Sequence, residues 1–570
     1  MEKRLIVAIV LSFLVLMGYQ YLFNKPDKTP QPPPVTAETA PAAPVPGTAA
    51  AVPAEEKPAP AEAEPAPAPT TPAVAVEAET KVVVETSLYR AEWSNKGGVL
   101  KSWVLKKHLN RAPGNKLIRA IKKLFGGKSE PQDPPQPLEI VTTKAHEIGR
   151  YPFSLGLDDT VLAGELNTAL FEASTASLDL ADGMVGELRF VFSDGASVQA
   201  EKVFRFTGGS YALDTEIRVW KDGRPVSPSV LWGPGISDLT AVDTKQSFSA
   251  VRGSAVYTGG KVYRMNERKF KAGENTYNFV DWAAYEEGYF AALFVLPPRK
   301  GQAAFLRESA EGQAPIHFLY VTEPQKAFIG PKSVDALKAF GHESKKVVNF
   351  GTFGSIAEIL LVAVKFFHRL VPNWGVAIIL LTIVIKIIFF PLTYSSTKSM
   401  AKMADLQPKV KAIRAKYKKA KTDIDQRRQM NEEMMRLYKE QGVNPAGGCL
   451  PLLIQLPVFW GVFRMLVVAV EFRHAPFALW IADLSTKDPF LVTPILMGIT
   501  QFISQKMTPS SADPTQAKMM LVMPFIMTIF FINFQSGLVL YWLTTNVLQI
   551  GQQAIMNKMM HRHPATAKAR

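Results

Sequence analysis

Cysteine is nearly absent from this chain of 570 residues, which contains only Cys449. A lone cysteine excludes an intrachain disulfide framework and every zinc site that needs several thiolates. The cysteine count therefore says nothing about whether the compartment is oxidising. The simplest interpretation of Cys449 is a small buried packing residue.

Metal-binding and catalytic motifs are also missing. The eight histidines form no HExxH and no other close ligand pair on a helix, and His561 and His563 lie in a polar tail. Gly127-Lys128-Ser129 resembles the end of a phosphate-binding loop, but Lys122 stands where that loop needs its first glycine. Because no nucleophile, base or ligand cluster is visible, the sequence predicts no cofactor, no metal and no enzyme.

Long apolar runs are present, and the first begins at Leu5. It extends for 19 residues to Phe23, enough to cross a hydrocarbon core of ~30 Å. Lys3 and Arg4 precede it, and it ends in bulky aromatic residues where a signal peptidase would need small ones. Residues 1–23 are therefore predicted to be an uncleaved signal anchor with a cytoplasmic N-terminus.

The next segment, residues 24–80, is rich in proline and alanine. It holds 15 of the 42 prolines of the chain within 57 residues. Such a composition cannot bury enough apolar surface to fold, so we expect a disordered tether.

Residues 81–345 change to the period-two alternation of a half-buried antiparallel sheet. Leu188 to Phe192 and Val203 to Phe206 flank the turn signal Ser193-Asp194-Gly195, which predicts a hairpin. Tyr211 to Trp220 leads into a second such turn, and Tyr289 to Leu296 is a further buried strand candidate. Many short strands predict a β-sandwich domain.

The C-terminal part holds an amphipathic segment and five apolar runs. Residues 350–370 carry apolar side chains at helical spacing with basic residues near the end, which predicts an interfacial helix. Residues 371–557 form a helical core, and residues 558–570 a basic tail. The core of a soluble protein could also contain such apolar runs, but five runs in succession with aromatic residues at their ends favour membrane spans. The predicted spans are 374–391, 450–470, 490–507, 519–534 and 538–555.

Loop charge orients these spans, because short loops rich in lysine and arginine stay in the cytoplasm. Residues 397–441 contain 13 Lys or Arg against 6 Asp or Glu, and their apolar spacing predicts a helical hairpin. A topology of six spans, with both termini inside and the β-rich domain outside, satisfies every loop.

Several short motifs stand out between residues 350 and 555, which include Asn373-Trp374-Gly375, Phe390-Pro391-Leu392-Thr393, Asn444-Pro445-Ala446-Gly447-Gly448-Cys449, Pro451-Leu452-Leu453-Ile454-Gln455 and Ser536-Gly537-Leu538-Val539-Leu540-Tyr541. In these motifs the core resembles the YidC membrane protein insertase family. The anchor and outer domain look like the Gram-negative version of the family. The resemblance implies a bacterial inner-membrane location, a periplasmic domain of β-supersandwich type, and a core with a hydrophilic groove open to the cytoplasm and the lipid. It also implies nascent membrane proteins as clients and the Sec translocon as a partner.

Lys386 lies within the second predicted span, where a cation costs ~3 kcal/mol on insertion scales. The family usually carries arginine at the matching position. Lysine keeps the charge but loses the planar fork that binds carboxylates in a bidentate manner. The resemblance implies that Lys386 attracts acidic residues of clients, while snorkelling to the cytoplasmic interface is the alternative.

Four further residues are predicted to line the groove: Thr382, Gln455, Tyr541 and Trp542. The alternatives are interhelical hydrogen bonding for the first two and packing or interfacial anchoring for the aromatic pair. Arg464 is interpreted as a cation that snorkels outward. Weaker groove candidates are Gln501, Gln505, Asn546 and Gln549.

The chain has a formal net charge of +15, and the positions of its basic residues indicate which partners it suits. The basic hairpin and tail suit ribosomal RNA or anionic lipid, or only a solvated face, and no DNA partner is expected. The methionine-rich hairpin is also suited to receiving clients.

A secondary transporter would show inverted repeats or paired acidic residues within spans, and the five core runs hold no Asp or Glu. A membrane-anchored enzyme would need a catalytic cluster in the outer domain.

Overall fold

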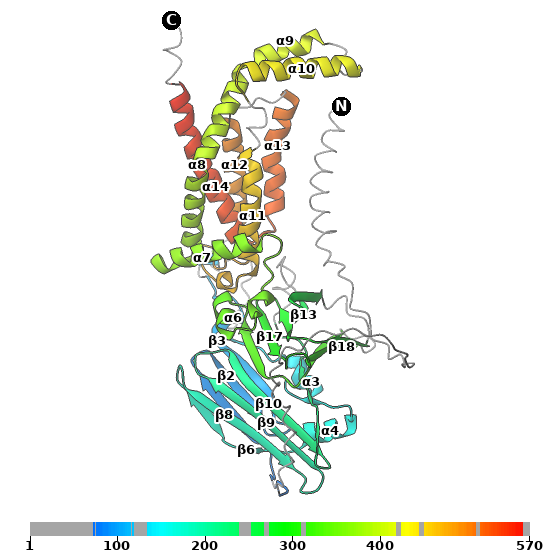
Figure 1. The fold of residues 1–570 in the computed structure, drawn as a ribbon. Helices are drawn as coiled ribbons and strands as arrows, with labels where there is room; N and C mark the ends of the chain where they lie inside the picture. Colours follow the sequence, from blue (N-terminus) through cyan, green and yellow to red (C-terminus); the bar gives the residue numbers. More distant parts are fainter. Residues whose placement is uncertain are drawn as a thin grey trace, which may run out of the picture.

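The structure of the chain is a computed structural model. It describes residues 72–74, 76–115, 117–118, 134–238, 252–266, 273–308, 315–417, 423–443, 450–508 and 514–561. The predicted signal anchor, most of the linker, residues 444–449 and residues 562–570 of the basic tail lie outside these ranges. Figure 1 shows a β domain, defined here as residues 81–347, and a helical core, residues 354–561, whose long helices extend away from it.

The β domain is mostly sheet, as predicted, and its described strands form three sheets. The first contains β1 (Lys81–Thr86), β2 (Tyr89–Ser94), β3 (Val99–Leu109), β4 (Pro137–Glu139) and β7 (Ser177–Leu180). The second contains β6 (Glu172–Ala173), β8 (Val185–Ser193), β9 (Val198–Thr207), β10 (Ala212–Lys221), β11 (Arg224–Val226), β13 (Arg252–Thr258), β14 (Lys261–Asn266), β16 (Trp282–Glu287), β17 (Phe290–Val295) and β20 (Lys326–Pro331). The third contains β5 (Leu155–Gly156), β12 (Ser229–Trp232), β15 (Gly273–Asn278), β18 (Gln302–Glu308) and β19 (Ile316–Thr322). Short helical segments between them are α3 (Thr143–Ile148), α4 (Thr160–Thr168), α6 (Val334–Phe340) and the 3₁₀ turn η2 (Ser344–Val347).

The predicted hairpins are confirmed by the strand pairing. β8 and β9 pair in antiparallel register, with Leu188 opposite Phe204. The Asp194 carboxylate accepts hydrogen bonds from the backbone N–H groups of Ala196, Ser197 and Val198, which fixes the turn. β10 and β11 form the second hairpin, and the buried strand candidate is β17, which lies between β16 and β20.

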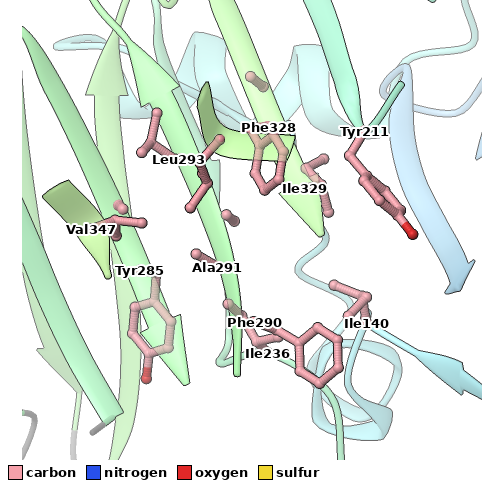
Figure 2. Close-up of a cluster of buried hydrophobic side chains, with 14 of the residues drawn as sticks. Ile140, Tyr211, Ile236, Tyr285, Phe290, Ala291, Leu293, Phe328, Ile329 and Val347 are labelled. Atoms are coloured by element: carbon pink, nitrogen blue, oxygen red, sulfur yellow. The ribbon is translucent and has the colours of Figure 1, made fainter. Parts of the chain in front are cut away.

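Aromatic side chains join the three sheets. The Trp93 ring on β2 lies 4.3 Å from Phe204 on β9, which packs the first sheet on the second. Phe294 on β17 lies 5.9 Å from Trp232 on β12, which connects the second sheet to the third. Figure 2 shows a neighbouring part of this core, where side chains of β17 and β20 lie with Ile140 and Ile236.

A lysine, Lys202, is fully buried in this core on β9. Its ammonium group donates hydrogen bonds to the carbonyl oxygens of Gly97 (2.6 Å), Gly98 (3.3 Å) and Phe153 (2.8 Å). These bonds satisfy the donors that burial would otherwise leave unpaired. Desolvation nevertheless lowers the pKa of Lys202 to about 7.

Most of the rest of the described chain is helical. α9 and α10 lie at the end of the core far from the β domain (Figure 1). The core elements are α7 (Gly354–Leu370), α8 (Trp374–Asp405), α9 (Gln407–Lys416), α10 (Ile424–Glu440), α11 (Leu450–Val468), η4 (Val470–Phe472), α12 (Val492–Met507), α13 (Pro514–Phe531) and α14 (Ser536–His561).

α8 continues well beyond the apolar run predicted to end at Pro391. The proline removes one backbone donor but does not end the helix, which runs to Asp405. Met400 and Met403, predicted as the start of the hairpin, therefore belong to the end of α8, and α9 begins separately at Gln407. Among the described residues, α8 is the one helix both long and apolar enough to cross a membrane, while Ile454–Val468 and Met520–Phe531 are shorter apolar segments.

α7 has three distinct faces. Leu361 and Val364 are buried on the face that packs against α11 and α8. Polar residues on a second face contact the β domain: Glu358 pairs with Lys338 at 3.1 Å. The third face is apolar and exposed, and it consists of Ile359, Val362, Phe366 and Leu370.

Candidate functional site

The predicted groove cation, Lys386, lies half-buried on α8 beside α14. Its Nζ donates a hydrogen bond of 2.9 Å to Oε1 of Gln549. The next two residues of the helix, Ile387 and Ile388, are exposed apolar side chains. No carboxylate of the described chain lies in ion-pair contact with Lys386; its acceptor is neutral, and the positive charge is not cancelled.

Thr382 lies one turn before Lys386 but is only 1% exposed. Its hydroxyl donates to the carbonyl of Ile378 at 2.6 Å, within its own helix. Thr382 therefore lies in the packed interior of the core. Its hydroxyl proton is already donated to the Ile378 carbonyl.

Gln455 and Tyr541 form a contact between α11 and α14. Nε2 of Gln455 donates to the Tyr541 hydroxyl at 2.9 Å, and Tyr541 is 1% exposed. This is an interhelical hydrogen bond, the alternative considered for Gln455. The two side chains remain polar groups within an apolar bundle and fix the position of α14 relative to α11.

Trp542 connects α14 to a third helix. Its indole N–H donates to Oε1 of Gln501 on α12 at 3.1 Å. The ring also packs at right angles to Phe459, with centroids 5.0 Å apart. Trp542 is therefore a packing residue with a polar contact inside the helical core.

The weaker candidates follow the same pattern. Asn546 is buried and donates to the carbonyl of Met497 on α12 at 3.1 Å. Gln501 and Gln549 are the acceptors for Trp542 and Lys386, and Gln505 is half-buried on α12. Side chains of α14 thus reach α8, α11 and α12.

The sequence motifs did not identify two further polar residues of α14, Thr545 and Gln553, as candidates. Together with Tyr541 and Gln549 they recur at every fourth position, which places them along one face of the helix. Gln553 is fully buried and donates to Oδ1 of Asn557 at 2.9 Å. The four-residue spacing was the signal that could have found them.

Arg464 on α11 is directed away from the Lys386 region. Its Nε donates to the carbonyl of Phe350 at 3.2 Å, and its guanidinium also contacts the carbonyl of Asn349. Both carbonyls belong to the segment between the β domain and α7. This direction agrees with the interpretation of Arg464 as an outward cation.

A partly buried group of three charged side chains lies at the same end of the core. Nζ of Lys365 on α7 lies 3.0 Å from Asp335 on α6 and 2.5 Å from Glu471 on η4. Burial lowers the pKa of Lys365, but the Glu471 and Asp335 carboxylates outweigh it and the net effect is a raised pKa. Lys365 therefore joins the β domain, α7 and the core in one charged contact.

Comparison with known proteins assigns the family. The chain is 38% identical over 585 residues to the "Membrane protein insertase YidC" of Geobacter sulfurreducens, with 100% of each chain covered. This chain belongs to the YidC family. A YidC insertase of Syntrophus aciditrophicus is 37% identical and covers 98% of this chain and 100% of its own. Among solved structures, "Active YidC insertase crystal structure with the first transmembrane domain resolved" matches at 20% identity and a TM-score of 0.34, over 84% of this chain and 93% of that one.

Two family models meet within the first helix of the core, close to the point where the fold changes. The model described as "YidC periplasmic domain" matches residues 128–363, and "60Kd inner membrane protein" matches residues 366–563. The boundary lies within α7. The predicted resemblance is therefore confirmed for both halves: a periplasmic domain built mostly of sheet and a helical core, in a family of inner-membrane insertases.

Proposed function

We propose that this chain inserts client proteins into the inner membrane by offering their polar segments a cationic, partly hydrated path along α8 and α14. The observation that carries the proposal is the half-buried ammonium group of Lys386 on α8, held by the neutral Gln549 amide of α14. Each unsatisfied polar group of a client costs several kcal/mol in hydrocarbon. An uncompensated cation part-way across would attract the acidic residues of the crossing segment and shorten that barrier.

The groove in this proposal is formed by the helices that α14 contacts. Lys386 supplies the charge, and Thr382, Gln455, Tyr541 and Trp542 supply polar or aromatic lining. Because Thr382 and Tyr541 are buried, a client would contact them only when the helices separate. In the closed state of the groove, Gln455 is hydrogen-bonded to Tyr541, and Trp542 is hydrogen-bonded to Gln501. No covalent step is involved, so the proposal requires neither a cofactor nor a metal.

The topology proposed has six membrane spans, with both termini cytoplasmic and the periplasmic domain of supersandwich type. The distant position of α9 and α10 supports it, because the basic hairpin lies at the end of the core opposite the β domain (Figure 1). α7 supports it as well. Its exposed apolar face suits the acyl boundary of the outer leaflet, while its polar face contacts the periplasmic domain.

Partners follow from the same arrangement. Nascent membrane proteins are the proposed clients, received either directly or from the Sec translocon. The basic α9 and α10 hairpin and the tail offer ribosomal RNA or anionic lipid a surface on the cytoplasmic side.

Reconstitution tests the function directly. The purified full chain in liposomes is expected to insert a small membrane protein with an acidic outer tail, without ATP, so that the tail becomes protected from added protease. Liposomes lacking the chain provide the control. Absence of insertion together with solute flux across the same liposomes would refute the proposal and favour a transporter.

A further inference from the structure

A pocket opens between the β domain and the first turn of α7. It has a volume of about 390 Å³. Its wall includes the cationic side chains of Arg264, Lys345 and Lys346, against one carboxylate, that of Glu358, among the described lining residues. The pocket therefore carries an excess of positive charge.

The beginning of α7 adds to this field. Gly354, the first residue of the helix, lines the pocket, and Phe353 before it provides no side-chain cap. The N–H of Gly354 itself donates to the carbonyl of Gly351 at 3.0 Å. The start of a helix nevertheless carries partial positive charge, which favours phosphate oxygens nearby.

The lysines of the pocket are accessible. Lys345 lies at 4.0 Å from Glu358, whose closer partner is Lys338 at 3.1 Å. Lys346 donates to the hydroxyl of Tyr257 at 2.9 Å and pairs with the exposed carboxylate of Glu343 at 3.3 Å. Their side chains keep 45% and 36% of their surface exposed. Both can reach a ligand while Glu358 keeps its pair with Lys338.

Arg264 has a structural role in the pocket. Its guanidinium donates to the carbonyl of Val347 at 3.1 Å and lies 3.5 Å from Glu286, which also pairs with Lys332 at 3.0 Å. These buried contacts hold Arg264 in place, so it forms the rigid back of the pocket.

The ligand class follows from charge and position. Phosphate is the anion that lysines and a helix start recognise together. The pocket adjoins the polar face of α7, and the apolar face of the same helix is exposed. With that apolar face in the outer leaflet, the pocket lies at the depth of the lipid headgroups.

We propose that this pocket binds the phosphate group of an anionic phospholipid of the outer leaflet, through Lys345, Lys346 and the N-terminus of α7. The bound lipid would then contact the periplasmic domain and the core at once and fix their relative position on the bilayer. The proposal rests on the placement of α7 proposed above. It does not depend on Lys386.

Native mass spectrometry of the full chain in a non-ionic detergent tests the proposal. The probes are short-chain phosphatidylglycerol and phosphatidylcholine of equal chain length. Wild type is expected to retain phosphatidylglycerol more strongly, and Lys345→Gln with Lys346→Gln is expected to weaken its binding about tenfold. Lys345→Arg with Lys346→Arg keeps both charges and should retain the binding of phosphatidylglycerol. Lys221→Gln with Lys326→Gln removes the same charge from exposed strand positions outside the pocket and should have no effect.

Three outcomes would overturn the proposal. Equal binding of the two lipids would show that headgroup charge is irrelevant. Equal loss in the pocket variant and in the control would reduce the effect to overall charge. Displacement of the lipid by millimolar inorganic phosphate would identify a site for free phosphate instead. Client insertion, measured separately in liposomes, distinguishes each of these from a failure of the proposed function.

Discussion

Nζ of Lys386 lies 2.9 Å from Oε1 of Gln549, so a cation of α8 is held by a neutral acceptor of α14. An amide positions the ammonium group without cancelling its charge, whereas a carboxylate would form an ion pair and weaken its attraction for a client. The pairing thus combines a fixed position with an available charge.

Replacement of Lys386 tests whether the charge acts on clients. Lys386→Ala is expected to reduce insertion of acidic-tailed clients about tenfold, which corresponds to ~1.4 kcal/mol of lost attraction. Lys386→Arg should preserve insertion because the charge remains. Lys402→Ala, at an exposed lysine near the end of the same helix, is the matched control. Equal protease protection of the client in all four proteins would remove Lys386 from the mechanism.

Gln549→Glu tests the same charge without removing it. The new carboxylate would lie close enough to Lys386 to pair with it, so insertion of acidic-tailed clients should fall while clients with neutral tails are less affected. Gln549→Leu removes only the acceptor and separates positioning from charge cancellation. If Gln549→Glu inserted acidic tails as well as wild type, an available positive charge would not be what the client senses.

The hydrogen bond between Gln455 and Tyr541 should stabilise the contact of α11 with α14. Tyr541→Phe leaves the Gln455 amide without this acceptor, at an expected cost of about 1 kcal/mol. Gln455→Leu removes the donor to the buried hydroxyl oxygen of Tyr541, with a similar result. The double variant should lose less than the two single variants together. Thermal unfolding in detergent measures all four proteins, and strict additivity would mean that the bond contributes nothing.

Much of the fold follows from local sequence pattern, and the remainder does not. Alternation and turn residues identify the β8 and β9 hairpin because both strands are consecutive. The parallel pairing of β1 with β7 joins Val84 to Leu178, which no local signal announces. Similarly, the apolar runs predict the core helices, but not that α8 continues through Pro391, since one missing donor does not decide where a helix ends.

The residues of the candidate site could likewise be predicted only in part from the sequence. Family motifs and intramembrane polarity identify Lys386, Gln455 and Trp542 as unusual residues. Their partners depend on how each helix is rotated about its axis, which spacing alone cannot give. Gln549 therefore appeared only as a weak candidate, although it is the acceptor for Lys386.

Gly498 permits the close packing of α12 against α13. A Cβ atom at this position would lie 2.0 Å from Oγ1 of Thr528, whose hydroxyl donates to the carbonyl of Pro524. Gly498→Ala is therefore expected to cost about 1–3 kcal/mol through overpacking. Gly551→Ala on α14 meets nothing within 4 Å and should be neutral or slightly stabilising. Equal thermal midpoints in detergent for the two variants would contradict this packing.

Lys202 should give the β domain a pH-dependent stability. Its folded pKa of about 7 lies below the ordinary value of 10.5, so between these values the unfolded state binds more protons. Stability then rises with pH, by roughly 1–2 kcal/mol from pH 7 to pH 9, because the penalty for burying the charged form is lost as the folded amine deprotonates. Lys202→Met removes this contribution and should flatten the rise, while Lys221→Met at an exposed position of β10 should keep it. The measurement is the thermal midpoint of the full chain, followed by tryptophan fluorescence across this pH range. If the wild-type midpoint rose from pH 7 to pH 9 no more than that of Lys202→Met, the buried amine would be shown to stay charged, held by its three carbonyl acceptors.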